Sequence, residues 1–336
     1  MNIKDQKKIV ENLLNKKENQ LKPSDKFQFK CTACGKCCWN IDVLINCYDM
    51  IRLRNGLKLT TKEIFQKDFV DFYLGPSSGL PVLRLNFLKM GDTKVTHCPF
   101  LMPAIDIKDA LKKIEEKAQG NKEEMKNLIE QIKTDPKNAA KILSGIKIDR
   151  WVCSIHKNRP IICRLYPCGR FQQIDRKTKE RKEMFMLQED QKGFCPGFEQ
   201  KYMTTLSEFL VSQNFYEYQV GSKLFTDIID FLISNGFRVA TKDNKNDNEK
   251  ASYSPNSNII LFLGNLIYNF DSFNTFSKDP KVVKTIYSEK STQDDFLYVE
   301  NKIYYVVKQF VETMKKQPLE LDFKVFLNTL PNKHEN

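Results

Sequence analysis

The eight residues CTACGKCC, at positions 31–38, hold four cysteines: Cys31, Cys34, Cys37 and Cys38. The first three are spaced C-x2-C-x2-C, which is the ligand spacing of a ferredoxin loop. One C-x2-C step is also how a zinc ribbon presents half of its tetrahedron. We expect Gly35 to adopt a positive φ in the tight turn that such a loop requires. The stretch predicts a metal site and leaves iron–sulfur and zinc both open.

Five further cysteines lie far downstream: Cys98 in THCPFL, Cys153, Cys163 and Cys168 in WVCSIHKNRPIICRLYPC, and Cys195 in GFCPGF. Cytosolic thiols are kept reduced, so ten cysteines in a chain without an export signal indicate metal binding more than disulfides. We expect the nine cysteines named so far to act as metal ligands. Adjacent side chains diverge in most backbone conformations, so Cys37 and Cys38 favour more than one metal. The tenth, Cys47, lies outside this spacing and is interpreted as a small apolar packing residue.

Three arginines surround the downstream cysteines: Arg159, Arg164 and Arg170. Thiolate-ligated metals are anionic, so we expect these guanidiniums to donate hydrogen bonds to sulfur and to offset the charge. His97 and His156 also lie near cysteines, and either could be a ligand. Because the cysteines are already sufficient, we expect both histidines beside the site or on the surface. A Cys–His protease is not expected, because it needs one activated thiol and not a cluster of them.

Charge and hydropathy limit the partners. The 336 residues include 54 Lys and Arg against 42 Asp and Glu, for a net charge of +12. The basic residues are dispersed and no DNA-binding motif is present, so nucleic acid is not the expected partner. The longest apolar runs, such as residues 259–270, are shorter than the about 20 residues that span a bilayer. The N-terminus lacks the pattern of a signal peptide. We expect a cytoplasmic protein without a membrane span.

Hydrophobic periodicity predicts an α+β fold, with short strands, a small cysteine-rich core nucleated by metal, and a mostly helical C-terminal region. The expected organisation is an N-terminal helix in residues 1–24, a metal-binding domain in 25–200 and a helical region in 203–336. Residues 102–150 are expected to be a helical insertion into the metal-binding domain. Residues 241–258 are polar and without periodicity, which is typical of a flexible loop.

Local signals predict several elements near the cysteine run. Residues 41–45 alternate as in a strand, and residues 83–87 do the same. Asn46 and Asp49 form a capping box that begins a helix, and Gly56 is expected to end it. Thr60 and Glu63 form a second capping box.

The motifs CTACGKCC, HCPFL and CSIHKNRPIICRLYPC occur in an order that resembles the YkgJ-type cysteine-cluster family, the CxxCxxCC group described as zinc- or iron-chelating proteins. The resemblance covers roughly residues 25–200. That family includes the flagellin lysine N-methylases, so the resemblance implies a second function, methyl transfer from S-adenosylmethionine to protein lysines. This chain differs from the family in the long interval between Cys98 and Cys153.

Three functional hypotheses follow. The first is a metal-binding protein that holds an iron–sulfur cluster, zinc or both through its cysteine thiolates. The second is the S-adenosylmethionine-dependent protein-lysine N-methylase. The third is a structural zinc scaffold that binds another protein through the helical insertion or the C-terminal region.

Overall fold

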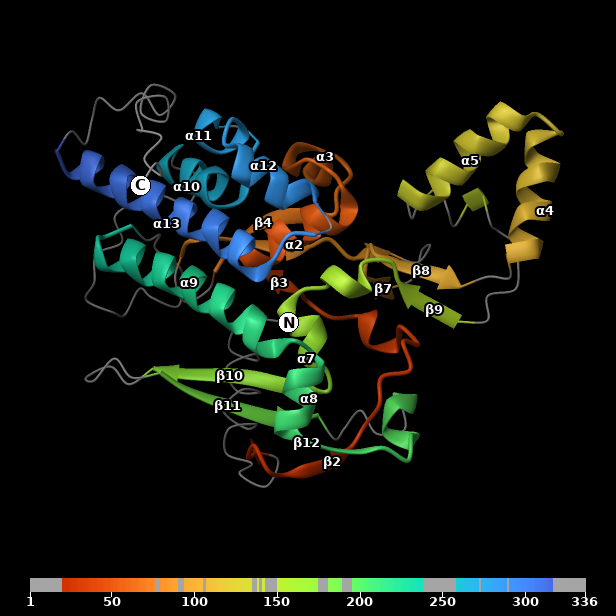
Figure 1. Ribbon diagram of the computed structural model, residues 1–336, viewed down its shortest axis with the longest axis horizontal. Helices are drawn as coiled ribbons and strands as arrows, with labels where there is room; N and C mark the ends of the chain where they lie inside the picture. Colours follow the sequence, from red (N-terminus) through yellow and green to blue (C-terminus); the bar gives the residue numbers. More distant parts are fainter. Residues whose placement is uncertain are drawn as a thin grey trace.

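The computed structural model describes residues 20–75, 79–89, 94–104, 107–134, 138, 141–142, 150–174, 181–188, 195–237, 258–271, 273–288 and 290–316. Within these ranges, helices and several small antiparallel sheets form an α+β fold, as predicted (Figure 1). The helix expected in residues 1–24 lies outside the description as far as residue 19. The loop expected in residues 241–258 also lies outside it, except that Asn258 begins a helix.

Five small sheets contain the strands of the described residues. Two have three strands, in the orders β1 (Gln20–Leu21), β11 (Arg181–Leu187), β10 (Cys168–Ile174) and β3 (Leu44–Ile45), β5 (Pro81–Leu85), β4 (Val70–Leu74). The other three are pairs: β2 (Lys26–Gln28) with β12 (Met203–Thr205), β6 (Leu88–Lys89) with β7 (Thr96–His97), and β8 (Leu101–Ala104) with β9 (Arg150–Cys153). All these pairings are antiparallel. The strand observed in the region 41–45 is shorter than predicted, because only Leu44 and Ile45 are register partners of residues in β5.

The helices before residue 200 are short. They are η2 (Lys36–Cys38), α2 (Cys47–Leu57), α3 (Thr61–Gln66), α4 (Ile107–Ala118), α5 (Lys122–Thr134), η3 (His156–Asn158), α7 (Ile161–Leu165) and η5 (Pro196–Glu199). The later ones are α8 (Leu206–Ser212), α9 (Phe215–Ser234), α10 (Asn258–Tyr268), α11 (Asn274–Ser277), α12 (Pro280–Tyr287) and α13 (Gln293–Lys316).

Helix α2 follows the cysteine run after the short strand β3 and lies at the centre of the fold (Figure 1). Both halves of its predicted capping box are present, since Asn46 and Asp49 each accept a hydrogen bond from the other's backbone N–H. The expected stop at Gly56 is wrong, because the helix continues to Leu57 and Lys58 takes the left-handed conformation. Gly56 instead permits a close approach, since a Cβ there would lie 2.6 Å from Asn158 Nδ2. The second capping box, Thr60 with Glu63, is confirmed at the start of α3.

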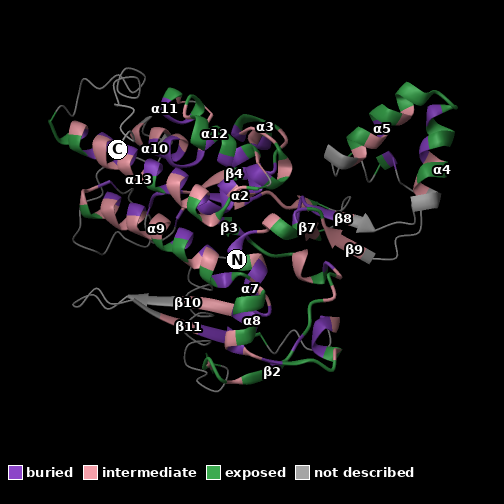
Figure 2. Cartoon of the chain, viewed as in Figure 1, coloured by how far each residue is buried: buried purple, intermediate pink, exposed green. Residues whose placement is uncertain are grey.

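One hydrophobic core joins the cysteine-bearing segments to the C-terminal helices. Helix α2 packs against α9, α10, α12 and α13 (Figure 1). Buried residues run along α13 (Figure 2), among them Ile303, Val307, Phe310 and Val311. The same cluster includes Cys98, Cys168 and Cys195. Residues before and after position 200 therefore share a single core.

In the sequence, helices α4 and α5 come between strands β8 and β9, which pair with each other. In space, the two helices extend away from the rest of the fold (Figure 1). They have a small core of their own, formed by Ile114, Ala118, Leu128 and Ile142. The expected helical segment between Cys98 and Cys153 is thus present in the described residues. Among those residues, no helix is long and apolar enough to cross a membrane.

Candidate metal centre

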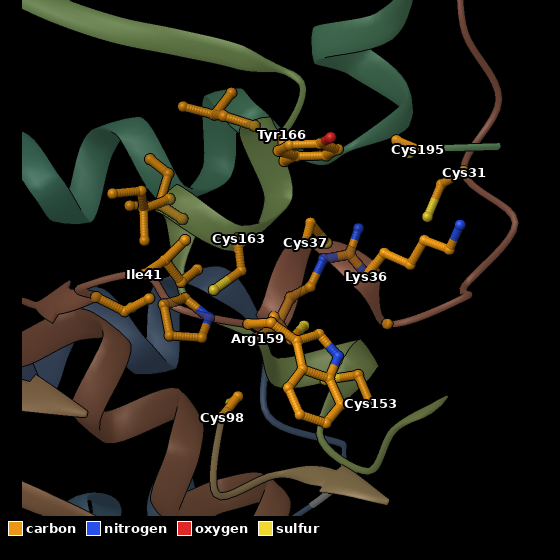
Figure 3. Close-up of a pocket in the computed structure, with 18 of the residues that line it drawn as sticks. Cys31, Lys36, Cys37, Ile41, Cys98, Cys153, Arg159, Cys163, Tyr166 and Cys195 are labelled. Carbon is orange, nitrogen blue, oxygen red and sulfur yellow. The ribbon is translucent and has the colours of Figure 1, made fainter. Parts of the chain in front are cut away.

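All nine cysteines predicted as ligands line one cavity of ≈ 670 Å³, here called the thiol cavity. Figure 3 labels Cys31, Cys37, Cys98, Cys153, Cys163 and Cys195 among them. The nine come from distant parts of the chain: Cys31, Cys34, Cys37, Cys38, Cys98, Cys153, Cys163, Cys168 and Cys195. All ten cysteines have free thiols. The gathering of these thiols is a property of the fold, because backbone contacts position each segment that carries them.

The loop with the first four cysteines turns twice through the left-handed region. Ala33 has φ 53° and Gly35 has φ 71°, so the expected positive φ of Gly35 is confirmed. A Cβ on Gly35 would lie 2.6 Å from Leu101 Cδ1 and 3.0 Å from Trp151 Cβ, so the turn is packed tightly against the β8–β9 hairpin. The Ala33 N–H donates to the Cys31 sulfur over 3.4 Å. Position 35 therefore favours glycine for two reasons: the backbone has a positive φ, and there is no space for a Cβ.

Backbone hydrogen bonds connect this loop to the next two cysteines. The Cys98 N–H donates to the Cys38 carbonyl over 2.9 Å, and the Leu101 N–H donates to the Cys98 carbonyl over 3.0 Å. Leu101 is also the register partner of Cys153 in the β8–β9 hairpin. The chain thus holds Cys38, Cys98 and Cys153 together although the helical insertion separates the last two in sequence.

The remaining cysteines lie on three short elements around the same cavity. Cys163 is in α7, where its N–H donates to the Pro160 carbonyl over 3.0 Å, and Cys168 is the first residue of β10. Cys195 directly precedes η5, and the Lys30 N–H donates to the Gly197 carbonyl over 3.0 Å. This last bond ties the segment entering the cysteine run to the segment of Cys195.

Burial keeps most of these thiols protonated in the absence of a metal. Burial raises the pKa of Cys98 to about 12 and that of Cys168 to about 12. The pKa of Cys37 is raised by its hydrogen-bonded contact with Cys38 and by burial. The pKa of Cys163 is raised by burial and then by the charges of Cys98, Cys153 and Cys37. A metal that binds here must displace protons, so its affinity will depend on pH.

The nine cysteines line one cavity, but their sulfurs do not converge on a common centre. Within the described residues, no group of three or more His, Cys, Asp or Glu side chains has the arrangement of a metal site. Thiolates as a donor set suit soft or borderline metals. The thiol cavity thus fits zinc or an iron–sulfur cluster by its chemistry.

The three arginines have different surroundings. The guanidinium of Arg159 lines the thiol cavity and donates to the His156 carbonyl over 3.0 Å and to Gln213 Oε1 over 2.6 Å. Arg164 is not among the lining residues. It is 7% exposed, lies 4.2 Å from the centre of the Tyr218 ring and donates to the Tyr218 hydroxyl over 2.9 Å. It also donates to the backbone carbonyls of three residues: Lys157, Arg159 and Gln213.

Arg170 lines the thiol cavity, and its guanidinium forms an ion pair of 2.5 Å with Glu183 on the neighbouring strand. The hydrogen bonds described for all three guanidiniums go to oxygen atoms. Arg159 is therefore the best placed of the three to offset thiolate charge.

The two histidines also differ. His97 does not line the cavity; its ring lies 5.2 Å from that of Trp39, and its Nδ1 is 3.0 Å from the Cys98 carbonyl oxygen. His156 lines the cavity, and burial together with the charges of Arg159 and Arg164 lowers its pKa. Cys47 is fully buried in the core, as interpreted, and its thiol donates to Glu300 Oε1 over 3.1 Å.

Tyr166 is a site residue that sequence reasoning missed. It lines the thiol cavity, and its hydroxyl oxygen is buried without a hydrogen bond of good geometry among the described residues. Burial, followed by the charge of Cys195, raises the pKa of Tyr166. Its position two residues before Cys168, in the run YPC, was the only signal available.

Comparison of the chain with models of known protein families, with curated proteins and with solved structures gives no significant match in any of the three. The resemblance to the CxxCxxCC family therefore stands on the order of the cysteine motifs alone.

Proposed function

We propose that this chain binds an iron–sulfur cluster, zinc or both through the thiolates of the thiol cavity. The observation that carries the proposal is the gathering of nine of the ten cysteines around one cavity. Thiolate ligands favour zinc and iron–sulfur clusters over hard cations such as Mg²⁺. The ferredoxin-like spacing of Cys31, Cys34 and Cys37 favours the cluster.

The residues around the cavity suit an anionic metal centre. Arg159 supplies a fixed positive charge, because both Gln213 and a backbone carbonyl orient its guanidinium. Hydrogen bonds and charge around sulfur are what a protein uses to tune such a centre. A bound cluster would supply electron transfer, and zinc would supply a structural cross-link. The free thiols require a reducing compartment, so we place this function in the cytoplasm.

Anaerobic purification, an absorption spectrum and metal and sulfide analysis test the proposal. We expect a brown protein with iron and acid-labile sulfide. Stoichiometric zinc in a colourless protein would reject the cluster and support a zinc scaffold. Protein that remains metal-free after anaerobic reconstitution with iron and sulfide, and also with zinc, would reject metal binding altogether.

A second candidate is the S-adenosylmethionine-dependent protein-lysine N-methylase, and the size of the thiol cavity favours it. The volume of ≈ 670 Å³ lies in the range of small-molecule sites, and the lining of the cavity includes the apolar residues Ile41, Ile162 and Phe87. Calorimetric titration of the metal-loaded protein with S-adenosylmethionine tests this candidate. Saturable binding supports the methylase, and the absence of heat across a concentration series rejects it.

A further inference from the structure

We infer that the thiol cavity binds a small organic anion. The guanidinium of Arg159 holds the carboxylate or phosphate group of this ligand, and the apolar body of the ligand lies against the apolar part of the lining. This binding goes beyond the proposed metal binding, because it uses the cations, hydroxyls and aliphatic side chains of the cavity and none of its thiols.

Arg159 has hydrogen-bond donors that its neighbours do not use. Its half-buried guanidinium donates through one amino group to the His156 carbonyl over 3.0 Å and through the other to Gln213 Oε1 over 2.6 Å. A guanidinium has more N–H groups than these two bonds use. In Figure 3 the Arg159 side chain extends among the labelled cysteines.

Arg159 also has no counter-charge at close range. Among the described residues, no carboxylate lies within ion-pair distance of Arg159. Its two hydrogen-bond acceptors are neutral, and both are oxygen atoms. A cation that neutral groups hold in place suits an oxyanion, because two oxygens of a carboxylate or phosphate match the planar fork of a guanidinium.

The charged groups around the cavity favour an anion. Among the described residues that line it, the cations are Lys36, Arg159 and Arg170, and the carboxylate is that of Asp42. Asp42 is exposed, so solvent and salt screen its charge. Arg164 adds a further guanidinium beside the cavity, since its Nε donates to the Arg159 carbonyl over 3.2 Å. An anionic ligand therefore enters a region of positive potential.

Two hydroxyls of the lining are available to the same ligand. The hydroxyl oxygens of Thr32 and Tyr166 are buried, and neither has a hydrogen bond of good geometry among the described residues. The Cys195 thiol lies beside the Tyr166 hydroxyl, but sulfur is a weak hydrogen-bond partner. Buried polar side-chain atoms are nearly always hydrogen-bonded, so unpaired hydroxyls that line a cavity indicate a place for polar atoms of a ligand. Both can donate to the oxygens of an anion.

The aliphatic residues of the lining indicate that the anion is an organic one. The cavity volume of ≈ 670 Å³ lies in the range of small-molecule sites. Ile41, Leu44 and Ile162 line this cavity, and they are 41%, 43% and 49% exposed. Removal of such aliphatic surface from water is favourable. An inorganic anion would leave these side chains in contact with water, whereas an organic anion with an apolar body covers them.

Calorimetric titration of the reduced full chain, both metal-free and metal-loaded, tests this inference with three probes. These are 3-phenylpropionate, benzyl phosphate and the uncharged 3-phenylpropanol. We expect saturable binding of at least one of the two anions to the metal-free chain, and about tenfold or more weaker binding of the alcohol. Binding of one anion and not the other identifies the oxyanion group. If neither anion binds in either state, or if the alcohol binds as tightly as the anions, the inference is overturned.

Three variants of the metal-free chain then test the role of Arg159. Arg159→Gln should weaken anion binding by about tenfold or more, and Arg159→Lys should weaken it less, because lysine keeps the charge without the fork. Arg84→Gln is the matched control, since it removes the same charge from a residue that stacks on Tyr73 and does not line the cavity. We expect the control to bind as the wild type does. Equal affinities in Arg159→Gln and the wild type would overturn the inference.

The outcome remains decisive if Arg159→Gln does not fold, as judged by circular dichroism. In that case the comparison of 3-phenylpropionate and benzyl phosphate with 3-phenylpropanol in the wild type decides alone. A chain that binds zinc or iron but neither anion would overturn this inference and leave the proposed function intact. A chain that binds an anion through Arg159 but no metal would do the reverse.

Discussion

The backbone N–H of Cys98 donates a hydrogen bond of 2.9 Å to the carbonyl of Cys38, so two cysteines far apart in sequence are held together by main chain alone. The neighbouring residues Trp39 and His97 form an antiparallel bridge at the same place. Both contacts are made by main-chain atoms. The fold therefore brings the segments of Cys38 and Cys98 together on this side of the thiol cavity.

Replacement of Gly35 by Ala should be more costly than the same change at Gly120. Both glycines have positive φ, 71° and 78°, so each variant loses about 1–2 kcal/mol from the left-handed conformation. A Cβ at position 35 also collides with Leu101 and Trp151, whereas nothing lies within 4 Å at position 120. Overpacking adds about 1–3 kcal/mol at Gly35. Urea unfolding of the two metal-free variants measures the difference, and equal losses would contradict the packing described here.

Substitution of Arg164 should mainly lower the free energy of unfolding, whereas substitution of Arg159 should mainly weaken metal binding. Arg164→Gln removes buried hydrogen bonds to three carbonyls and to Tyr218, so we expect a loss of about 3 kcal/mol in the free energy of unfolding. Arg159→Gln should cost about 1 kcal/mol in the metal-free protein and weaken metal binding through lost charge. Urea unfolding and chelator competition measure the two effects. Equal metal affinity in Arg159→Gln and the wild type would remove Arg159 from the site.

Asp49 should give the protein a stability that falls with rising pH. Burial raises the pKa of Asp49 to about 6, although the N–H groups of Ile161 and Asn46 partly oppose this. Since the ordinary value is near 4, the folded chain holds this proton more tightly than the unfolded chain. The contribution is complete below about pH 4 and is lost as the pH rises through 6, by about 3 kcal/mol.

Asp49→Asn isolates this contribution. The difference in unfolding free energy between the wild type and the variant, measured from pH 4 to pH 7, should shrink with rising pH. A difference that stays constant over this range would show that Asp49 does not titrate between these values.

Thiol alkylation should distinguish the cysteines by position. Cys31 is exposed and should react first in the metal-free protein. Cys47 is fully buried, and burial raises its pKa well above the usual value, so it should stay unmodified while the protein is folded. If the cavity binds metal as proposed, metal loading should protect the cysteines that line it. Mass spectrometry of alkylated peptides checks this order, and modification of Cys47 before Cys31 would be incompatible with the core described here.

The sequence predicted features that depend on neighbouring residues. The capping boxes of α2 and α3 were correct because each needs only a side chain and an N–H three residues away. The prediction that Gly56 ends α2 was wrong. Gly56 instead allows a close approach of Asn158, which is distant in sequence and gives no local signal. The β10–β11 hairpin could not be predicted from hydrophobic periodicity, since polar residues such as Arg170, Gln172 and Gln173 interrupt the alternation of apolar and polar residues.

The candidate site divides in the same way. The sequence predicted as site residues all nine cysteines that line the cavity, because clustered cysteines indicate a metal site whatever the fold around them. Tyr166 and Gln213 could not be found, since tyrosine and glutamine become part of a site only through the fold around them. The separate roles of Arg159 and Arg164 likewise depend on Gln213 and Tyr218, which lie in the later helical region.

The β8–β9 hairpin makes the helical insertion replaceable. Ala104 and Arg150 are register partners, so the chain leaves the hairpin and returns to it at adjacent positions. A tight turn in place of α4 and α5 would leave the pairing of Leu101 with Cys153 unchanged, and with it the approach of Cys153 to Cys98. The insertion can therefore vary in length or in surface chemistry, or be exchanged for another segment, while the half of the chain that carries the cavity cysteines keeps its geometry.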